Sequence, residues 1–193
     1  MKKIIYCFAV IFTSALIFNS CQSDFLETNP TDKISSNGVT SSTETAWIAL
    51  NGIHRALYVR YQSQGRGGLG AYYIHMDDMG EDMVFNYATY TTYLRWLNRD
   101  ESNDYNRDTW LMFYGWISNA NIIINGIENA SGELADKNAI KGQALLYRAF
   151  CHFELVQMYA SGYQSGIENS QPGIPLMVKN ITDGVGRGTG RAR

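Results

Sequence analysis

The chain has 193 residues, of which 45% are hydrophobic and 18% are charged, and its net charge is −2. This length and composition are typical of one modest globular domain that can bury a core. The net charge argues against a nucleic-acid-binding protein, because such proteins usually present a basic face.

The N-terminus predicts export. A basic start, Met1–Lys3, precedes the apolar run Ile4–Phe18, which is shorter than the roughly 20 residues that a membrane span needs. Residues 1–20 therefore read as a signal peptide. Cys21 follows the small residue Ser20 as in a bacterial lipobox, so we expect its thiol to carry lipid. Each methylene of an acyl chain that is buried in the bilayer stabilises membrane attachment by about 0.8 kcal/mol. The alternative is an ordinary cleaved signal followed by an unrelated cysteine.

Cysteine usage bounds the chemistry of the mature chain. Of three cysteines, Cys7 leaves with the signal and Cys21 is the expected lipid site, so Cys151 remains and no internal disulfide can form. Cys151 lies in an apolar helical stretch, which favours a buried structural thiol over a nucleophile.

The first half of the mature chain predicts a tether and a helix. Residues 21–40 are polar and lack a sustained period. Ser41 to Glu44 fit a capping box, and the helix that follows to Tyr61 carries an apolar stripe at helical spacing: Ala46, Trp47, Leu50, Ile53, Leu57 and Tyr61. Residues 62–70 read as a Gly-rich loop. Their G-x-G-x-x-G pattern follows a helix rather than a buried strand, which disfavours nucleotide binding.

The sequence after residue 70 predicts a short helix and a helical hairpin. A short helix is expected over 71–84 and a loop over 85–104. Long helices are expected over Tyr105–Asn129 and Glu133–Ala160, separated by a tight break, and two helices joined in this way pack antiparallel. The second long helix is apolar around most of its circumference, which predicts partners on more than one side. Loop follows from Ser161, so the predicted fold class is all-α.

Three segments of the chain stand out together: the lipidated start Cys21–Glu27, the helix Gly142–Val156 with its Arg-Ala-aromatic run, and the turn Gly173–Leu176. They resemble the SusD/RagB family of surface glycan-binding lipoproteins. Gln143 stands where the family usually has an acidic residue. In order, these segments cover the chain from Cys21 to about Thr189.

The resemblance implies paired helices similar to tetratricopeptide repeats with long connecting loops, and no catalysis. No cofactor and no metal are expected. It implies a lipid-anchored protein on the surface of the cell outer membrane. The implied partners are an oligosaccharide or polysaccharide and a TonB-dependent transporter of the SusC type. The domains are then a signal peptide (1–20), a lipidated tether (21–40), a SusD-like N-terminal helical domain (41–189) and an atypical tail (190–193). The alternative is a helical-repeat adapter that binds only protein, and a lipid-anchored glycosidase is disfavoured.

The C-terminal sequence departs from the family pattern. In relatives, Arg187-Gly188-Thr189 is followed by a capped helix, whereas this chain ends Gly190–Arg193. We therefore expect the N-terminal portion of a longer protein; a genuine short protein is the alternative.

The segment Tyr87–Asn98 is the predicted glycan site. It is rich in aromatic residues yet lacks a helical stripe, so its rings are free to stack on the apolar face of a sugar. Tyr93 and Trp96 supply such rings, while Arg95 and Asn98 can hydrogen-bond the hydroxyl rim. Trp96 has an equally supported alternative role in core packing.

An acidic group beside this segment supplies further candidates. Asp77 and Asp78 can accept hydrogen bonds from sugar hydroxyls. Oxygen-rich clusters also suit Ca²⁺, but no Gly-punctuated calcium loop is present. Carboxylate pairs serve glycoside hydrolysis as well, although the separation that this chemistry needs is spatial and is not encoded by spacing.

Overall fold

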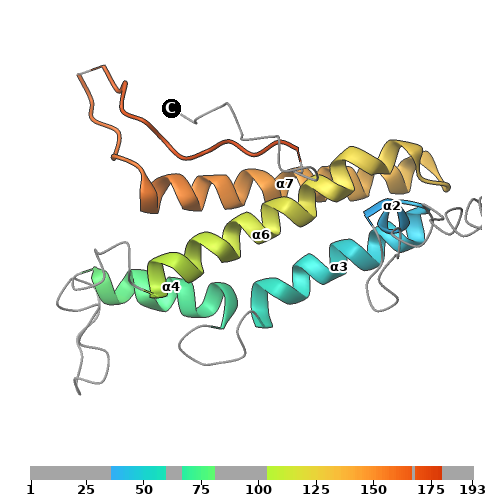
Figure 1. Ribbon diagram of the computed structural model, residues 1–193, viewed down its shortest axis with the longest axis horizontal. Helices are drawn as coiled ribbons and strands as arrows, with labels where there is room; N and C mark the ends of the chain where they lie inside the picture. The colour runs from blue at the N-terminus through green and yellow to red at the C-terminus, as the bar shows by residue number, and fades with distance from the viewer. Residues whose placement is uncertain (1–35, 60–66, 81–103, 167, 180–193) are drawn as a thin grey trace, which may run out of the picture. The chain divides into compact units, whose positions relative to one another are not determined.

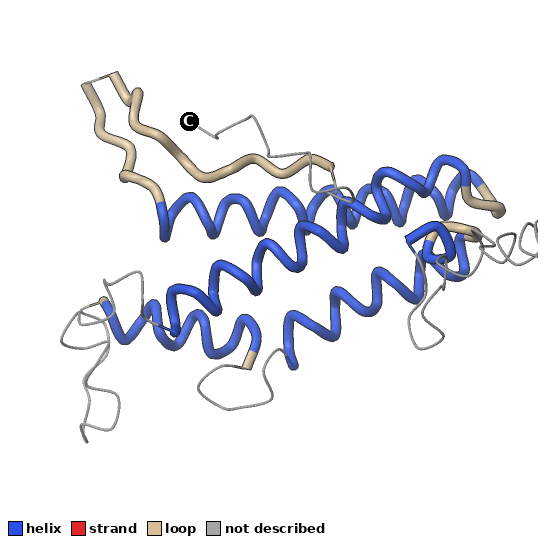
Figure 2. The backbone as a smooth tube through the Cα atoms, in the orientation of Figure 1, coloured by secondary structure: helices blue, strands red, loops and turns tan. Residues whose placement is uncertain are grey.

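The computed structural model describes residues 36–59, 67–80, 104–166 and 168–179, and all regular secondary structure within them is helical (Figures 1 and 2). The all-α prediction is confirmed. The chain divides into two units, 1–35 and 36–193, and the described residues all belong to the second. Its helices are α2 (Ser36–Val39), α3 (Thr43–Val59), α4 (Gly68–Met79), α6 (Asp104–Gly126), the 3-10 turn η3 (Ile127–Asn129) and α7 (Leu134–Tyr159).

Helices α6 and α7 form the predicted hairpin. The helices run antiparallel and share the most extensive packing of any pair (Figure 1). The break falls at residues 130–133. Gly132 has a φ of +127°, and a Cβ there would lie 2.2 Å from Oγ1 of Thr43. Glycine is therefore needed here both for the backbone conformation and for the close approach of α3.

The start of α3 uses a different capping pair from the predicted one. Ser42 Oγ accepts a hydrogen bond from the Thr45 backbone N–H, and the Ser42 N–H donates back to Thr45 Oγ1, both at 3.2 Å. The reciprocal box is thus Ser42 with Thr45, and the prediction of Ser41 with Glu44 was wrong by one residue. Thr45 takes the place of the glutamate in this box, because its hydroxyl accepts the hydrogen bond from the backbone N–H of the capping residue although its side chain is shorter.

Two apolar clusters fill the space between the helices. The first joins α3, α6 and α7 through small and branched side chains that allow close approach: Ala46, Leu50, Ile53, Ala120, Ile123, Ile127, Ala130, Ile140 and Ala144. The second adds α4 and a C-terminal segment, and it is more aromatic: Tyr72, Met112, Phe113, Trp116, Ile117, Cys151, Leu155 and Ile174. Ring contacts continue this second cluster outward, with Phe113 edge-on to both Tyr72 and Trp116.

Helix α4 begins earlier than predicted. Residues 68–70 were expected in a loop, but they form its first turn. Gly68 has a φ of +60°, and a Cβ there would lie 2.1 Å from the Leu57 carbonyl oxygen. The missing side chain therefore lets α4 start directly against the last turns of α3.

The C-terminal segment returns along the hairpin without regular structure, as predicted from Ser161 onward (Figure 2). We call residues 173–178 the strap. Its Ile174 is buried in the second cluster, and the Tyr114 hydroxyl donates to the Pro175 carbonyl at 2.7 Å. The strap therefore belongs to the folded unit.

Within the ranges that the structure describes, no helix has the length and apolarity to cross a membrane.

Candidate functional site

In the sequence, the predicted ligand-binding segment falls between α4 and α6. Tyr93, Arg95, Trp96 and Asn98 fall outside the described residues, as does the predicted lipid site Cys21. The described chain stops at Gly80, just after α4, and resumes at Asp104, the first residue of α6. The last turn of α4 and the first turn of α6 therefore flank the segment.

Two contacts hold these helix ends together. The rings of His75 in α4 and Tyr105 in α6 meet edge-to-face, with centroids 4.6 Å apart. The Tyr105 hydroxyl donates to the Tyr72 carbonyl at 3.5 Å. Both tyrosines and His75 are buried. The packing thus fixes both attachment points of residues 81–103 at one end of the helical unit.

The two predicted aspartates occupy different environments. Asp77 is exposed on the last turn of α4, whereas Asp78 is only 3% exposed. Asp78 Oδ2 lies 3.7 Å from His75 Nδ1, and its Oδ1 is buried with no hydrogen-bond partner among the described residues. Asp77 can reach a ligand in solvent, while Asp78 is turned into the interior. The structure does not bring them together as an open carboxylate pair.

Glu154 is a buried carboxylate that sequence reasoning missed. It is 8% exposed, and its two oxygens accept hydrogen bonds from the hydroxyls of Tyr72 and Tyr73, each at 3.0 Å. Burial, together with the bond to this carboxylate, raises the pKa of Tyr73 to about 12. Both tyrosines therefore remain donors at physiological pH. A glutamate inside an otherwise apolar helix run was the signal that could have revealed this contact between α4 and α7.

We expect Glu154→Ala to destabilise the fold by about 2–4 kcal/mol, because it leaves the buried Tyr72 hydroxyl and the half-buried Tyr73 hydroxyl without an acceptor. Chemical denaturation of the purified chain measures this loss. Tyr73→Phe is the matched control: it removes one donor and leaves the carboxylate bonded to Tyr72, so it should cost about 1 kcal/mol or less. Equal effects of the two variants would contradict the description of Glu154 as the shared acceptor.

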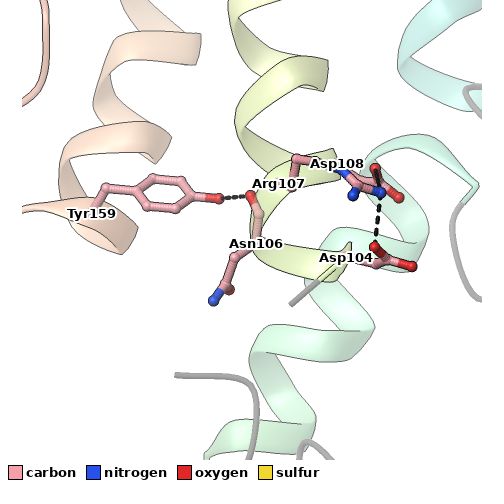
Figure 3. A network of polar contacts seen from close by, with 5 residues as sticks. All are labelled: Asp104, Asn106, Arg107, Asp108 and Tyr159. Carbon is pink, nitrogen blue, oxygen red and sulfur yellow. Dashed lines mark hydrogen bonds and ion pairs between the residues drawn. The ribbon is translucent and has the colours of Figure 1, made fainter. Parts of the chain in front are cut away.

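The first turn of α6 carries a second polar network (Figure 3). Arg107 Nη2 lies 2.8 Å from the Asp104 carboxylate and 3.5 Å from that of Asp108. The Tyr159 hydroxyl, from the last turn of α7, donates to the Asn106 carbonyl at 2.6 Å. This bond joins the end of α7 to the start of α6, the helix that follows residues 81–103 in the sequence.

Two further side chains that could be reactive in other settings, those of Cys151 and His54, have structural environments. Cys151 is fully buried, and burial raises the pKa of its thiol to about 12, which confirms the prediction of an inert structural thiol. His54 lies edge-on to Tyr147 with ring centroids 5.2 Å apart. Among the described residues, no group of three or more His, Cys, Asp or Glu side chains could hold a metal ion.

A comparison with protein-family models shows to which family the chain belongs. The SusD-like family model, described as starch-binding and associating with the outer membrane, matches residues 24–191. The chain belongs to the SusD-like family. Its description assigns the members starch binding and outer-membrane association. No curated protein and no solved structure gives a significant match to the chain.

In this SusD-like chain, the helix segment Gly142–Val156 divides its residues between three surfaces. Ala144, Cys151 and Leu155 are buried against the other helices. Arg148 and His152 contact the strap through hydrogen bonds. A third face is exposed and apolar, and it includes Leu145, Leu146, Ala149 and Phe153. The broad apolar circumference predicted for this helix is therefore only partly covered by the described residues.

Proposed function

We propose that this SusD-like chain is a non-catalytic, lipid-anchored protein of the outer-membrane surface that captures oligosaccharide for a TonB-dependent transporter. The observation that carries the proposal is the family match, which extends over residues 24–191 and is described as starch-binding. The signal-peptide pattern and Cys21 support the lipid anchor, since acyl chains attach a protein firmly to a bilayer.

We assign glycan contact to the segment between α4 and α6. Trp96 and Tyr93 would stack on the sugar face, and Arg95 and Asn98 would bond its hydroxyls. The contact between His75 and Tyr105 supports this assignment, because it holds the two helix ends that flank the segment close together. Exposed Asp77 lies on the α4 side of the same segment and is a further candidate. Asp78 would reach a ligand only if its buried environment opened.

The protein-only adapter is the second candidate. The observation that favours it is the exposed apolar face of α7, where Leu146 is 66% exposed and Phe153 is also exposed. Apolar surface of this kind commonly marks contact with another protein. The glycan-capture protein should bind sugar and the adapter should not, so measurements of glycan binding separate the two candidates.

We expect Trp96→Ala to weaken glycan binding by at least about tenfold, because loss of a central aromatic side chain costs more than 1.4 kcal/mol. Affinity electrophoresis in gels that contain starch or another polysaccharide measures the change. Tyr163→Ala is the matched control, since Tyr163 is 82% exposed but lies on the segment after α7. It should bind as the unmodified chain does. Unchanged binding by Trp96→Ala would show that the site lies elsewhere.

A further inference from the structure

The two ends of the strap are attached by different means. At the first end, Ile174 is fully buried in the aromatic cluster and the Tyr114 hydroxyl holds the Pro175 carbonyl. At the second end, Leu176 and Val178 are exposed, and Met177 is partly buried against the same cluster. Polar side chains of α6 and α7 also hold this second end.

Three side chains bind the backbone of the second end. Asn121 Nδ2 donates to the Met177 carbonyl at 3.0 Å, and Arg148 Nη1 donates to the Val178 carbonyl at 3.4 Å. Arg148 also donates to Asn121 Oδ1 at 3.0 Å, which orients the amide. The Met177 N–H donates to His152 Nε2 at 3.1 Å. Of these three side chains, His152 is the one that can gain a proton near neutral pH, and its Nε2 can accept a hydrogen bond only while the ring is neutral.

The partners of His152 define a single tautomer. Its Nδ1 lies 2.8 Å from the Arg148 carbonyl oxygen, which can only accept, so Nδ1 carries the hydrogen. Its Nε2 receives the Met177 N–H and therefore carries none. Protonation would place a hydrogen on Nε2, facing another N–H across 3.1 Å. The bond to Met177 would then become a repulsive contact between two donors.

We propose that protonation of His152 releases the Met177–Val178 end of the strap, while Ile174 keeps the other end seated in the core. The groups that face His152 are the Tyr114 ring from α6, Arg148 from its own helix and the Met177 N–H from the strap. Tyr114 stays neutral in the relevant range, because burial raises its pKa to about 12. Release frees the Arg148 guanidinium and the Asn121 amide from the strap carbonyls.

The direction of the pH effect follows from the environment. Burial lowers the pKa of His152 and the Arg148 cation lowers it further, which outweighs the opposite effect of the bond to the Arg148 carbonyl. The folded chain thus favours neutral His152, and the unfolded chain binds the proton more readily. The attachment of the Met177–Val178 end is complete above about pH 6.5, the ordinary histidine pKa. It weakens as the pH falls toward the lowered pKa that His152 has in the folded chain.

Amide hydrogen exchange, measured by NMR on the full chain, tests the proposal. The protection factor of the Met177 amide should fall at least about tenfold between about pH 7.5 and pH 5, while the amides of Ile140 and Ala144 in α7 remain protected. His152→Gln offers a side-chain oxygen that does not titrate, so its Met177 protection should change less than about twofold. His54→Gln, a half-buried histidine of α3, is the matched control and should keep the transition.

Several results would overturn the proposal. These are persistent Met177 protection at the lower pH in the unmodified chain, loss of the transition in His54→Gln, or simultaneous loss of protection at Ile140 and Ala144. A second measurement needs no variant: long-range ¹H–¹⁵N NMR of the His152 ring should show hydrogen on Nδ1 and a pKa below about 6.5. Hydrogen on Nε2 at neutral pH would overturn the proposal on its own.

Discussion

Trp116→Ala should lower the free energy of unfolding by about 3–5 kcal/mol, because it removes a large ring from a close-packed core. Trp116 is 1% exposed and lies in the aromatic cluster that joins α4, α6, α7 and the strap. Its ring meets Phe113 edge-on, with centroids 5.3 Å apart. Chemical denaturation of Trp116→Ala and of the unmodified chain, followed by circular dichroism, measures the loss.

Two comparison variants make this result specific. Leu146→Ala removes an apolar side chain that is exposed on α7, so it should change stability by about 0.5 kcal/mol or less. Trp116→Phe keeps an aromatic ring and removes an indole N–H that is buried with no hydrogen-bond partner among the described residues, so it should cost clearly less than alanine. A loss for Leu146→Ala as large as that for Trp116→Ala would contradict this placement of the core.

Gly68→Ala should lower the free energy of unfolding by about 2–4 kcal/mol, through a positive φ and a direct clash. Its Cβ would lie 2.1 Å from the Leu57 carbonyl oxygen and 2.9 Å from the Tyr58 carbonyl carbon. These are backbone atoms of α3 that cannot rotate away. Helix α4 would have to move off α3, and its contacts with Glu154 would weaken as well.

Gly70→Ala is the matched control in the same helix turn. No atom lies within 4 Å of a Cβ at Gly70, and its φ is not positive. Alanine there should be neutral or stabilise the fold by up to about 1 kcal/mol, because glycine is a poor helix former. If Gly68→Ala were as stable as Gly70→Ala, the close packing of α4 on α3 would be wrong. Thermal unfolding of both variants gives the comparison.

The long helices could be predicted because their apolar spacing and their capping and breaking residues agree. The break at Gly132 and the helix ends near Asp104 and Tyr159 follow directly from this agreement. The start of α4 could not be predicted, because three of the four residues in Gly67–Gly70 are glycines, and the local sequence pattern therefore indicates a loop. Only the contact of Gly68 with α3 explains why a helix begins there.

The polar contacts were harder to predict than the helices. Glu154 meets Tyr72 and Tyr73 across about 80 positions of the chain, and no local pattern encodes such a pairing. Asp77 and Asp78 are adjacent in the sequence, but helical geometry turns one outward and the other inward. The segments around Arg148 and Gly173–Leu176 were recognised as a resemblance. The hydrogen bonds of this helix to Met177 and Val178, which directly follow Leu176, emerge only from the fold.

The most direct test of glycan capture is a glycan array probed with the full chain. If this SusD-like protein holds oligosaccharide, the array should show saturable binding to starch fragments or to one related class of glycan. Soluble oligosaccharide of that class should compete for the site. Absence of binding to every glycan, together with specific capture of a protein partner through the α7 face, would contradict glycan capture and favour the adapter.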